Sequence, residues 1–298
     1  MKVLVSGSSG LVGSALVALL TKGGHGVVRL IRSRSSRPDE IEWDPISGRV
    51  DLALLEGLDA VVHLAGENIA SGRWTAERKR KLRESRVRGT KALSEALSKL
   101  ARPPRVLASA SAIGYYGDRG DEVLHEESEP GSSFLAALCR DWEEATKSAR
   151  GRGLRVACLR FGVILSPRGG ALQKMLLPFR MGVGGKVGSG KQYMSWISID
   201  DAVGAAHHVL SRDSLDGPVN VVAPSPVTNL ELTKTLGKVL SRPAVFPMPA
   251  LVARLVFGEM ADELLLASAR VEPRKLLAAG YAFQHPQLEG ALRHLLGL

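Results

Sequence analysis

The 298-residue chain has only two cysteines, Cys139 and Cys158, and no long apolar run. Two cysteines are too few for a disulfide framework, and their spacing fits no metal site, so we expect no bound metal. No stretch approaches the roughly 18 apolar residues of a membrane span, and the N-terminus lacks the basic and apolar segments of a signal peptide. We therefore expect a cytoplasmic protein without a membrane partner.

Positive charge is concentrated in one segment. The formal net charge is +10, and residues 77–91 (ERKRKLRESRVRGTK) carry eight Lys or Arg against two Glu. A basic helix can bind nucleic-acid phosphates, but this segment lacks interleaved aromatic residues and matches no nucleic-acid motif. We predict a solvated helix face, part of which lines a cofactor cleft. A nucleic-acid-binding module is the least favoured alternative.

The first thirteen residues carry the clearest motif. An apolar strand at 1–6 is followed by glycines in the spacing G-x-x-G-x-x-G, at Gly7, Gly10 and Gly13, and then by a helical pattern. Glycine permits a tight strand-to-helix turn and close approach of the backbone to a pyrophosphate, and free N–H groups at the helix start face the anion. The motif predicts a dinucleotide-binding turn, with an ordinary strand-to-helix turn as the alternative.

The second expected strand, 27–31, ends in basic residues rather than an acidic one. Proteins specific for NAD usually place Asp or Glu here, on the ribose 2′-hydroxyl. This chain has Arg32, followed by Arg34 and Arg37. A guanidinium can bind a 2′-phosphate bidentately, whereas a carboxylate would repel it. The sequence therefore favours NADP(H) over NAD(H), with a solvated surface loop as the alternative role of these arginines.

Strand-like runs alternate with helical periodicity along the chain. Strands are expected at 3–5, 27–31, 41–43, 60–64, 105–108, 155–159 and 219–222, and long helices at 76–100 and 132–150. This alternation is typical of a Rossmann α/β fold, a doubly wound parallel sheet. We predict an NADP-binding domain at 1–165, to which 195–225 returns. A smaller C-terminal substrate-binding cap is expected within 166–298, where glycine and proline are frequent.

Further motifs resemble those of the extended short-chain dehydrogenase/reductases. They are His63-Leu64-Ala65-Gly66, Ser109-Ala110-Ser111 with Tyr115-Tyr116-Gly117-Asp118, and Arg160 to Leu165. The segments HLAGEN at 63–68, Trp142-Glu143, PFR at 178–180 and PSPVTN at 224–229 resemble the epimerase-like branch of nucleoside-diphosphate-sugar epimerases. The resemblance spans essentially the whole chain. It implies an NADP(H)-binding oxidoreductase or epimerase for a small carbonyl or nucleotide-sugar-like substrate, and it is compatible with a homo-oligomer.

The resemblance also implies which residues contact the cofactor. The expected contacts are Gly7, Ser9, Gly10, Leu11 and Val12 at the pyrophosphate, Arg32 at the 2′-phosphate, Asp44 at the adenine, Leu64, Ala65 and Gly66 near the ribose, Lys81 and Arg86 on the basic helix, and Leu165 at the nicotinamide. A plain packing role is the alternative for Leu165. We expect His63 to be structural rather than catalytic.

The helix expected at 132–150 lacks the catalytic pair of this family. In Y-x-x-x-K the tyrosine moves a proton and the lysine lowers its pKa, while a Ser or Thr on the preceding strand orients the oxygen. Ser111 corresponds to that Ser or Thr, but Leu135 and Cys139 occupy the Tyr and Lys positions when the helix is aligned through Glu143. In the register shifted by one residue, Phe134 and Leu138 occupy them. Ser198 also stands where relatives commonly have His.

Three alternatives stay open for the chemistry. Tyr115 or Tyr116 could supply the phenol, with Lys81 or Arg86 supplying positive charge. Cys139 could act instead, although a helix-borne cysteine is more often an inert small hydrophobe. In the third alternative the chain is a non-catalytic NADPH-binding sensor or scaffold.

Overall fold

The computed structural model describes all residues from Met1 to Leu298. The main strands are β1 (Lys2–Ser6), β2 (Gly26–Ile31), β3 (Glu40–Glu42), β4 (Ala60–His63), β5 (Val106–Ala112), β7 (Arg155–Phe161) and β11 (Gly217–Val221). They form one sheet in the order β11-β7-β5-β4-β1-β2-β3, and every neighbouring pair is parallel. The predicted doubly wound Rossmann sheet is confirmed.

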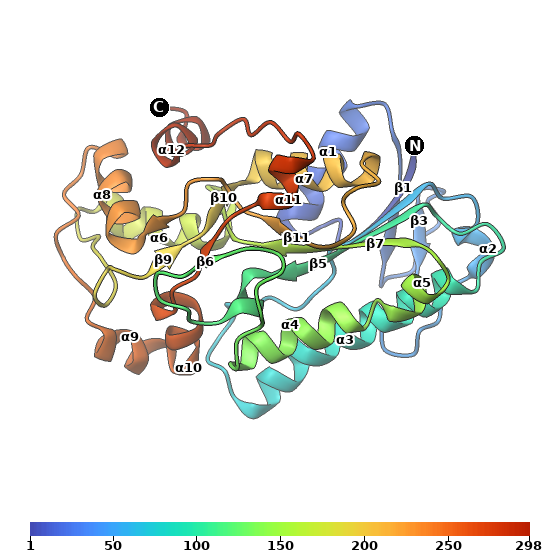
Figure 1. Cartoon of the computed structure of the whole chain (residues 1–298), viewed down its shortest axis with the longest axis horizontal. Helices are drawn as coiled ribbons and strands as arrows, with labels where there is room; N and C mark the ends of the chain where they lie inside the picture. The colour runs from blue at the N-terminus through green and yellow to red at the C-terminus, as the bar shows by residue number, and fades with distance from the viewer.

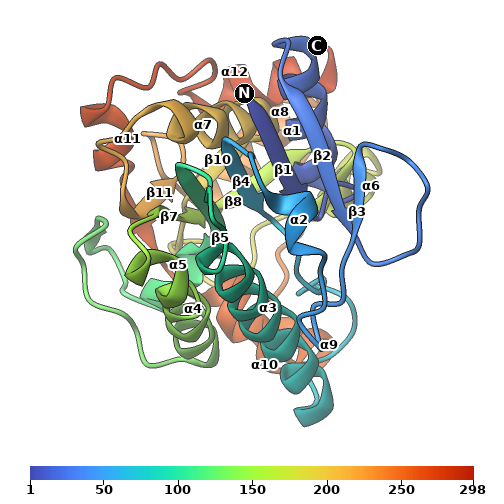
Figure 2. The same cartoon turned by 90° about the vertical axis from the view of Figure 1, so that its right-hand side faces the viewer.

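Helices cover both faces of this sheet (Figures 1 and 2). One face carries α1 (Leu11–Lys22) and α7 (Ile199–Ser211), and the other carries α3 (Ala76–Ser98), α4 (Phe134–Glu144) and α5 (Lys147–Gly151). Successive side chains of a strand point to opposite faces. Val3 and Val5 therefore pack in the core beneath α1 and α7, whereas Leu4 packs in the core beneath α3.

The later elements gather at one end of the sheet (Figure 1). Their helices are α6 (Gly170–Arg180), α8 (Asn229–Val239), α9 (Ala250–Phe257), α10 (Glu259–Ala261), η2 (Asp262–Leu266) and α12 (Leu288–Leu296), whereas α11 (Arg274–Ala278) lies over the sheet against β11. Their strands are β8 (Val163–Ser166), β9 (Tyr193–Met194), β10 (Trp196–Ser198), β12 (Val227–Thr228) and β13 (Arg270–Val271). Leu172, Trp196 and Leu232 belong to a separate buried cluster here. This end therefore has its own apolar core.

Three short elements connect the strands and helices described above. They are α2 (Leu52–Leu55), the single turn η1 (Ile113–Tyr116) after β5, and β6 (Val123–Leu124), which pairs with β13. The C-terminal region also returns to the sheet, because Leu276 of α11 is buried in the same cluster as β11. The chain contains no helix that combines the length and the apolar character needed to cross a membrane.

Candidate cofactor and active site

An open glycine turn joins β1 to α1. Gly7 has φ +66°, and a Cβ on Gly13 would lie 2.1 Å from the Gly7 carbonyl oxygen, so these two glycines shape the turn itself. Gly10 is exposed, and a Cβ there would meet only the Gly7 oxygen, at 3.3 Å. No side chain caps α1, and its first turn holds no acidic residue. The first N–H groups of the helix are therefore available to an anion.

The other turn residues lie where an anion at this helix end could reach them. Ser9 is exposed next to Gly10, and Leu11 and Val12 are partly buried at the first two positions of α1. Their backbone N–H groups belong to the first turn, which has no intrahelical acceptors. The structure thus brings the predicted pyrophosphate residues together at the turn from β1 into α1.

Arg32 directly follows β2 and is exposed. It forms no hydrogen bond or ion pair within the chain, and neither does Arg34, whereas Arg37 lies 3.7 Å from Glu40. Asp44 has a different environment: its carboxylate accepts from Ser47 Oγ at 2.7 Å and from the Ile46 N–H at 2.9 Å. These hydrogen bonds lower the pKa of Asp44. Arg32 is free to bind a ligand, while Asp44 stabilises its own turn.

The loop after β4 lies against Arg86. Leu64 and Ala65 are partly buried, and a Cβ on the exposed Gly66 would lie 3.5 Å from the Arg86 guanidinium carbon. Arg86 is 9 % exposed and donates to the backbone oxygens of Glu67 and Leu82 at 2.9 and 3.3 Å. Burial lowers the pKa of Arg86. A buried cation therefore faces the loop predicted to contact the ribose.

Arg86 differs from the rest of the basic segment 77–91. Each of the other seven Lys and Arg residues has a carboxylate within 4.0 Å, including Lys81, which pairs with Glu77 on the exposed side of α3. Arg86 has no such partner. Because these charges are paired locally, the helix offers little free positive charge to nucleic-acid phosphates. Arg86 is therefore the one buried cation of the segment, and it lies next to Gly66.

Ser111 belongs to a buried polar network. Its Oγ donates to Glu143 at 2.7 Å, and Arg160 donates to both oxygens of Glu143, at 2.8 and 2.9 Å. Ser111 and Arg160 are opposite one another in the β5–β7 register, and Glu143 reaches them from α4. The carboxylate is thus held in place by a cation and a hydroxyl.

The two neighbouring tyrosines have opposite surroundings. Tyr116 is fully buried, donates to Asn220 Oδ1 at 2.7 Å and accepts from Arg160 Nη1 at 2.9 Å. Burial raises the pKa of Tyr116 to about 12. Tyr115 is partly exposed, its hydroxyl makes no hydrogen bond within the chain, and its ring centroid lies 3.5 Å from the Arg160 guanidinium carbon. Tyr116 is tied into the core, whereas the Tyr115 hydroxyl is free.

The positions of the missing Tyr and Lys are both apolar and buried. Leu135 is 5 % and Cys139 3 % exposed, and Leu135 packs against Gly114 of the turn after β5. Burial, together with Glu143, raises the pKa of the Cys139 thiol to about 12. A thiol in this state is a poor nucleophile and proton donor at neutral pH. The surroundings of Cys139 are those of a packing residue.

Leu165 and His63 are both buried in the core. Leu165 is 1 % exposed within the cluster that includes Trp196, which favours the packing alternative over a contact with the nicotinamide. His63 is fully buried, with Nδ1 2.6 Å from Ser6 Oγ and its ring edge-on to Trp43. Burial lowers the pKa of His63 to about 4. It is a neutral structural histidine that links β1 and β4.

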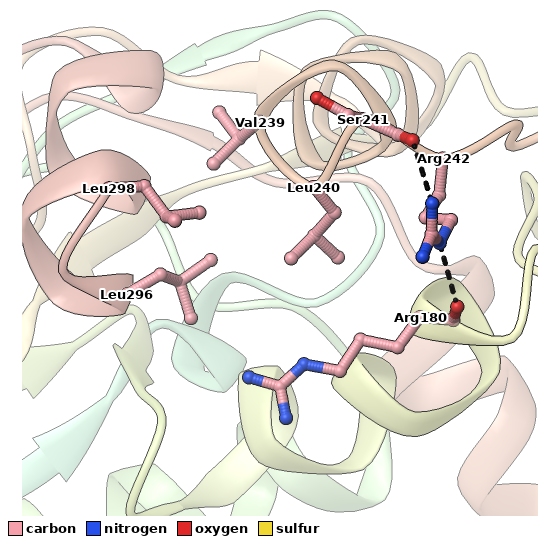
Figure 3. Close-up of a pocket in the computed structure, with 7 residues that line it drawn as sticks. All are labelled: Arg180, Val239, Leu240, Ser241, Arg242, Leu296 and Leu298. Carbon is pink, nitrogen blue, oxygen red and sulfur yellow. Dashed lines mark hydrogen bonds between the residues drawn. The ribbon is translucent and has the colours of Figure 1, made fainter.

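Two concavities lie apart from the glycine turn. One, of about 520 Å³, is lined by Tyr115 and Glu143 together with Arg140 and Pro218. The other, of about 400 Å³, lies between the ends of α6, α8 and α12 (Figure 3). There Arg242 donates to the backbone oxygens of Arg180 and Ser241, at 3.1 and 3.4 Å. Of the predicted site residues, only Tyr115 lines either concavity.

The chain is similar to proteins of one family over nearly its full length. The model of the NAD-dependent epimerase/dehydratase family matches residues 3–222, and a domain of unknown function matches residues 248–295. The chain belongs to the NAD-dependent epimerase/dehydratase family. An epimerase family protein of Mycobacterium bovis is 44 % identical over 97 % of this chain and 96 % of its own length.

Two solved structures of family members are also similar. The crystal structure of human epimerase family protein SDR39U1 with NADPH has a TM-score of 0.91 and 37 % identity, covering 100 % of this chain and 99 % of the human one. A nucleoside-diphosphate sugar epimerase from Corynebacterium glutamicum has a TM-score of 0.83 and 40 % identity, covering 100 % of this chain and 58 % of its own.

Sequence reasoning assigned no role to the ion pair of Glu143 and Arg160. Both residues belong to motifs typical of the family, yet their roles depend on contacts between β7 and α4. One signal was present: Arg160 interrupts the apolar run VACLRFGVIL at 156–165. A buried arginine requires a partner, so this interruption predicts a carboxylate close by.

Proposed function

We propose that this family member binds NADP(H) and acts as a reductase or epimerase on a small carbonyl or nucleotide-sugar-like substrate. The observation that carries the proposal is the pairing of an open glycine turn with Arg32, an exposed arginine that has no partner in the chain. The NADPH in the structure of the human relative supports the same cofactor.

The residues present fit the parts of NADP(H). The α1 N-terminus would hold the pyrophosphate, Arg32 the 2′-phosphate, and the loop Leu64-Ala65-Gly66 the ribose. Arg86 would supply, from α3, the positive charge that lysine provides in Y-x-x-x-K, because its buried guanidinium has no carboxylate partner. NADP(H), when bound, donates or accepts the hydride.

Tyr115 is the better candidate for proton transfer. Its hydroxyl is free, whereas that of Tyr116 is engaged by Asn220 and Arg160 and has a raised pKa. Ser111, near the end of β5, would orient the substrate oxygen. The Ser111 hydroxyl itself donates a hydrogen bond to Glu143. The stacked Arg160 restricts the Tyr115 ring, which keeps its hydroxyl in a narrow range of positions.

A non-catalytic NADPH sensor is the second candidate. The observation that favours it is the burial of both Leu135 and Cys139 where a working enzyme of this type carries tyrosine and lysine. Under this candidate the Ser111–Glu143–Arg160 network only stabilises the fold. The two candidates share the cofactor site and differ in whether Tyr115 meets a substrate.

Arg32→Glu tests the cofactor. Each charge-assisted hydrogen bond to a 2′-phosphate contributes roughly 1.5–3 kcal/mol, or about ten- to a hundredfold in affinity, so the loss of two should lower NADPH affinity by at least about a hundredfold. NADH affinity should be maintained, because the pyrophosphate site is unchanged. Calorimetry at fixed, moderate salt separates this effect from the screened attraction of Arg34. Equal affinity of the wild-type chain for NADH and NADPH would remove the assignment.

Tyr115→Phe tests the catalytic proposal on a panel of carbonyl compounds and nucleotide sugars. Loss of a general acid lowers kcat by about 10²- to 10⁴-fold, while NADPH affinity should not change. Tyr116→Phe is the control, and it should lower stability rather than turnover because its hydroxyl lies within the core. Wild-type turnover in Tyr115→Phe would eliminate the assigned proton donor. NADPH binding without any turnover in the wild-type chain would favour the sensor.

A further inference from the structure

A group of potential metal ligands lies on the surface between α7 and α12, on segments remote in sequence from the glycine turn. Asp200 is the second residue of α7, His294 is in the last turn of α12, and His285 precedes that helix. One ligand atom from each of the three residues lies within 4.8 Å of the others. Two imidazoles and one carboxylate are a donor set that suits divalent transition metals such as Zn²⁺.

The chain that carries His285 is held by a buried carboxylate. Asp201 is fully buried and accepts from the backbone N–H groups of Gln284 and His285, at 2.7 and 2.9 Å. Tyr281 donates to the same residue, at 3.0 Å to its backbone oxygen and 3.3 Å to its carboxylate. Asp201 thereby fixes the backbone from which the His285 ring projects beside Asp200. Hydrogen bonds that hold the backbone of a ligand residue lower the free energy needed to order a metal site.

The two histidine rings and Asp200 are already close to one another. His294 Nε2 lies 2.9 Å from Asp200 Oδ2, and the rings of His285 and His294 are stacked with centroids 4.1 Å apart. Two ligands at about 2.1 Å on a tetrahedral ion are roughly 3.4 Å apart. The His294 side chain is 52 % exposed and can rotate to close the remaining gap. Its exposure also lets an ion enter and leaves room for water as a fourth ligand.

No Lys or Arg side chain forms an ion pair with Asp200. Arg293, next to His294, points to Glu289 and bonds it at 3.0 and 3.2 Å. We propose that Asp200, His285 and His294 form a surface site for a Zn²⁺-class divalent ion. The bound ion would link α12 to α7, and so fasten the C-terminal region to the Rossmann sheet.

Zinc chloride added to the metal-free chain at pH 7.5 tests the proposal. Competition with a chromophoric chelator should give one ion per chain, and a hundredfold excess over the dissociation constant should raise Tm by roughly 5 °C. His294→Ala should abolish both effects while leaving Tm in chelator close to wild type, because the side chain is exposed. Asp200→Asn should weaken binding by at least about tenfold.

A second histidine pair provides the matched control. His25 and His207 have Nε2 atoms 3.2 Å apart, with His207 about two helical turns further along α7 than Asp200, and no carboxylate lies beside them. His207→Ala should leave zinc stoichiometry and the Tm shift intact. Zinc binding that persists in His294→Ala, or that is lost in His207→Ala, would overturn the proposed site.

Discussion

Two regions at the ends of neighbouring strands of the same sheet differ in how their polar groups are satisfied. Around β1 and β2 the first N–H groups of α1 and the guanidinium of Arg32 have no partner in the chain. Around β5, β7 and α4 the polar side chains bind one another, as in Ser111–Glu143–Arg160. The first region therefore has polar groups available to a ligand, whereas the second has satisfied its polar groups internally.

This difference explains which features could be predicted from sequence. The glycine spacing and the arginine after β2 are local patterns, so their role follows from the backbone turn that they share. The polar network joins Ser111, Glu143 and Arg160 across two strands and a helix, and no local spacing encodes it. The proposed cofactor contacts therefore follow from residues that are neighbours in the sequence, whereas the Ser111–Glu143–Arg160 network does not.

The same reasoning applies to the fold. The apolar strands were predicted close to their bounds, but β5 and β7 extend to Ala112 and Phe161, further than expected. Ser109, Ser111 and Arg160 interrupt the apolar pattern there while the backbone continues as strand, because these side chains are buried within the molecule. The single helix expected at 132–150 is divided near Thr146, whose Oγ1 donates to the Glu143 backbone oxygen.

The largest expected effect is a loss of stability from breaking the Ser111–Glu143–Arg160 network, with the glycine turn left unchanged. Arg160→Met leaves the Glu143 carboxylate and the Tyr116 hydroxyl without their cation, and removing one partner of a buried pair costs about 3–5 kcal/mol of unfolding free energy. Urea unfolding measures this loss, while NADPH affinity of the folded fraction should stay unchanged.

The exposed pair Lys147–Glu144 is the control for that variant. Lys147→Met should cost less than about 1 kcal/mol, because both side chains are solvated. A loss of similar size in both variants would mean that the Arg160 network contributes no more than an ordinary surface pair.

The next effect is a pH dependence of stability that originates at His63, the last residue of β4. Burial lowers the pKa of His63 to about 4, from an ordinary 6.5. Between these values the unfolded chain binds a proton that the folded chain does not, so stability falls as pH decreases. The contribution of His63 should amount to about 3 kcal/mol between pH 6.5 and pH 4.

Urea unfolding of the wild-type chain and of His63→Gln, across this pH range, isolates that contribution. The slope should be smaller in the variant, whatever its stability at neutral pH. His125→Gln is the control for replacing a histidine as such, at a side chain that is 29 % exposed. Equal slopes in wild type and His63→Gln would show that His63 is not held neutral by burial.

The smallest expected effect sharpens the comparison most, because it separates binding from folding within one turn. Gly10 has φ −74°, which alanine adopts freely, and its Cβ would meet only the Gly7 oxygen at 3.3 Å, so Gly10→Ala should cost less than about 1 kcal/mol of stability. The same methyl group would occupy the space for the pyrophosphate and weaken NADPH binding by at least about tenfold, or about 1.4 kcal/mol.

Gly13→Ala is the contrasting variant, since its Cβ would lie 2.1 Å from the Gly7 oxygen and must displace the backbone. Calorimetry and urea unfolding of both variants distinguish the two roles. Unchanged NADPH affinity in a folded Gly10→Ala chain would mean that the pyrophosphate does not lie against this glycine.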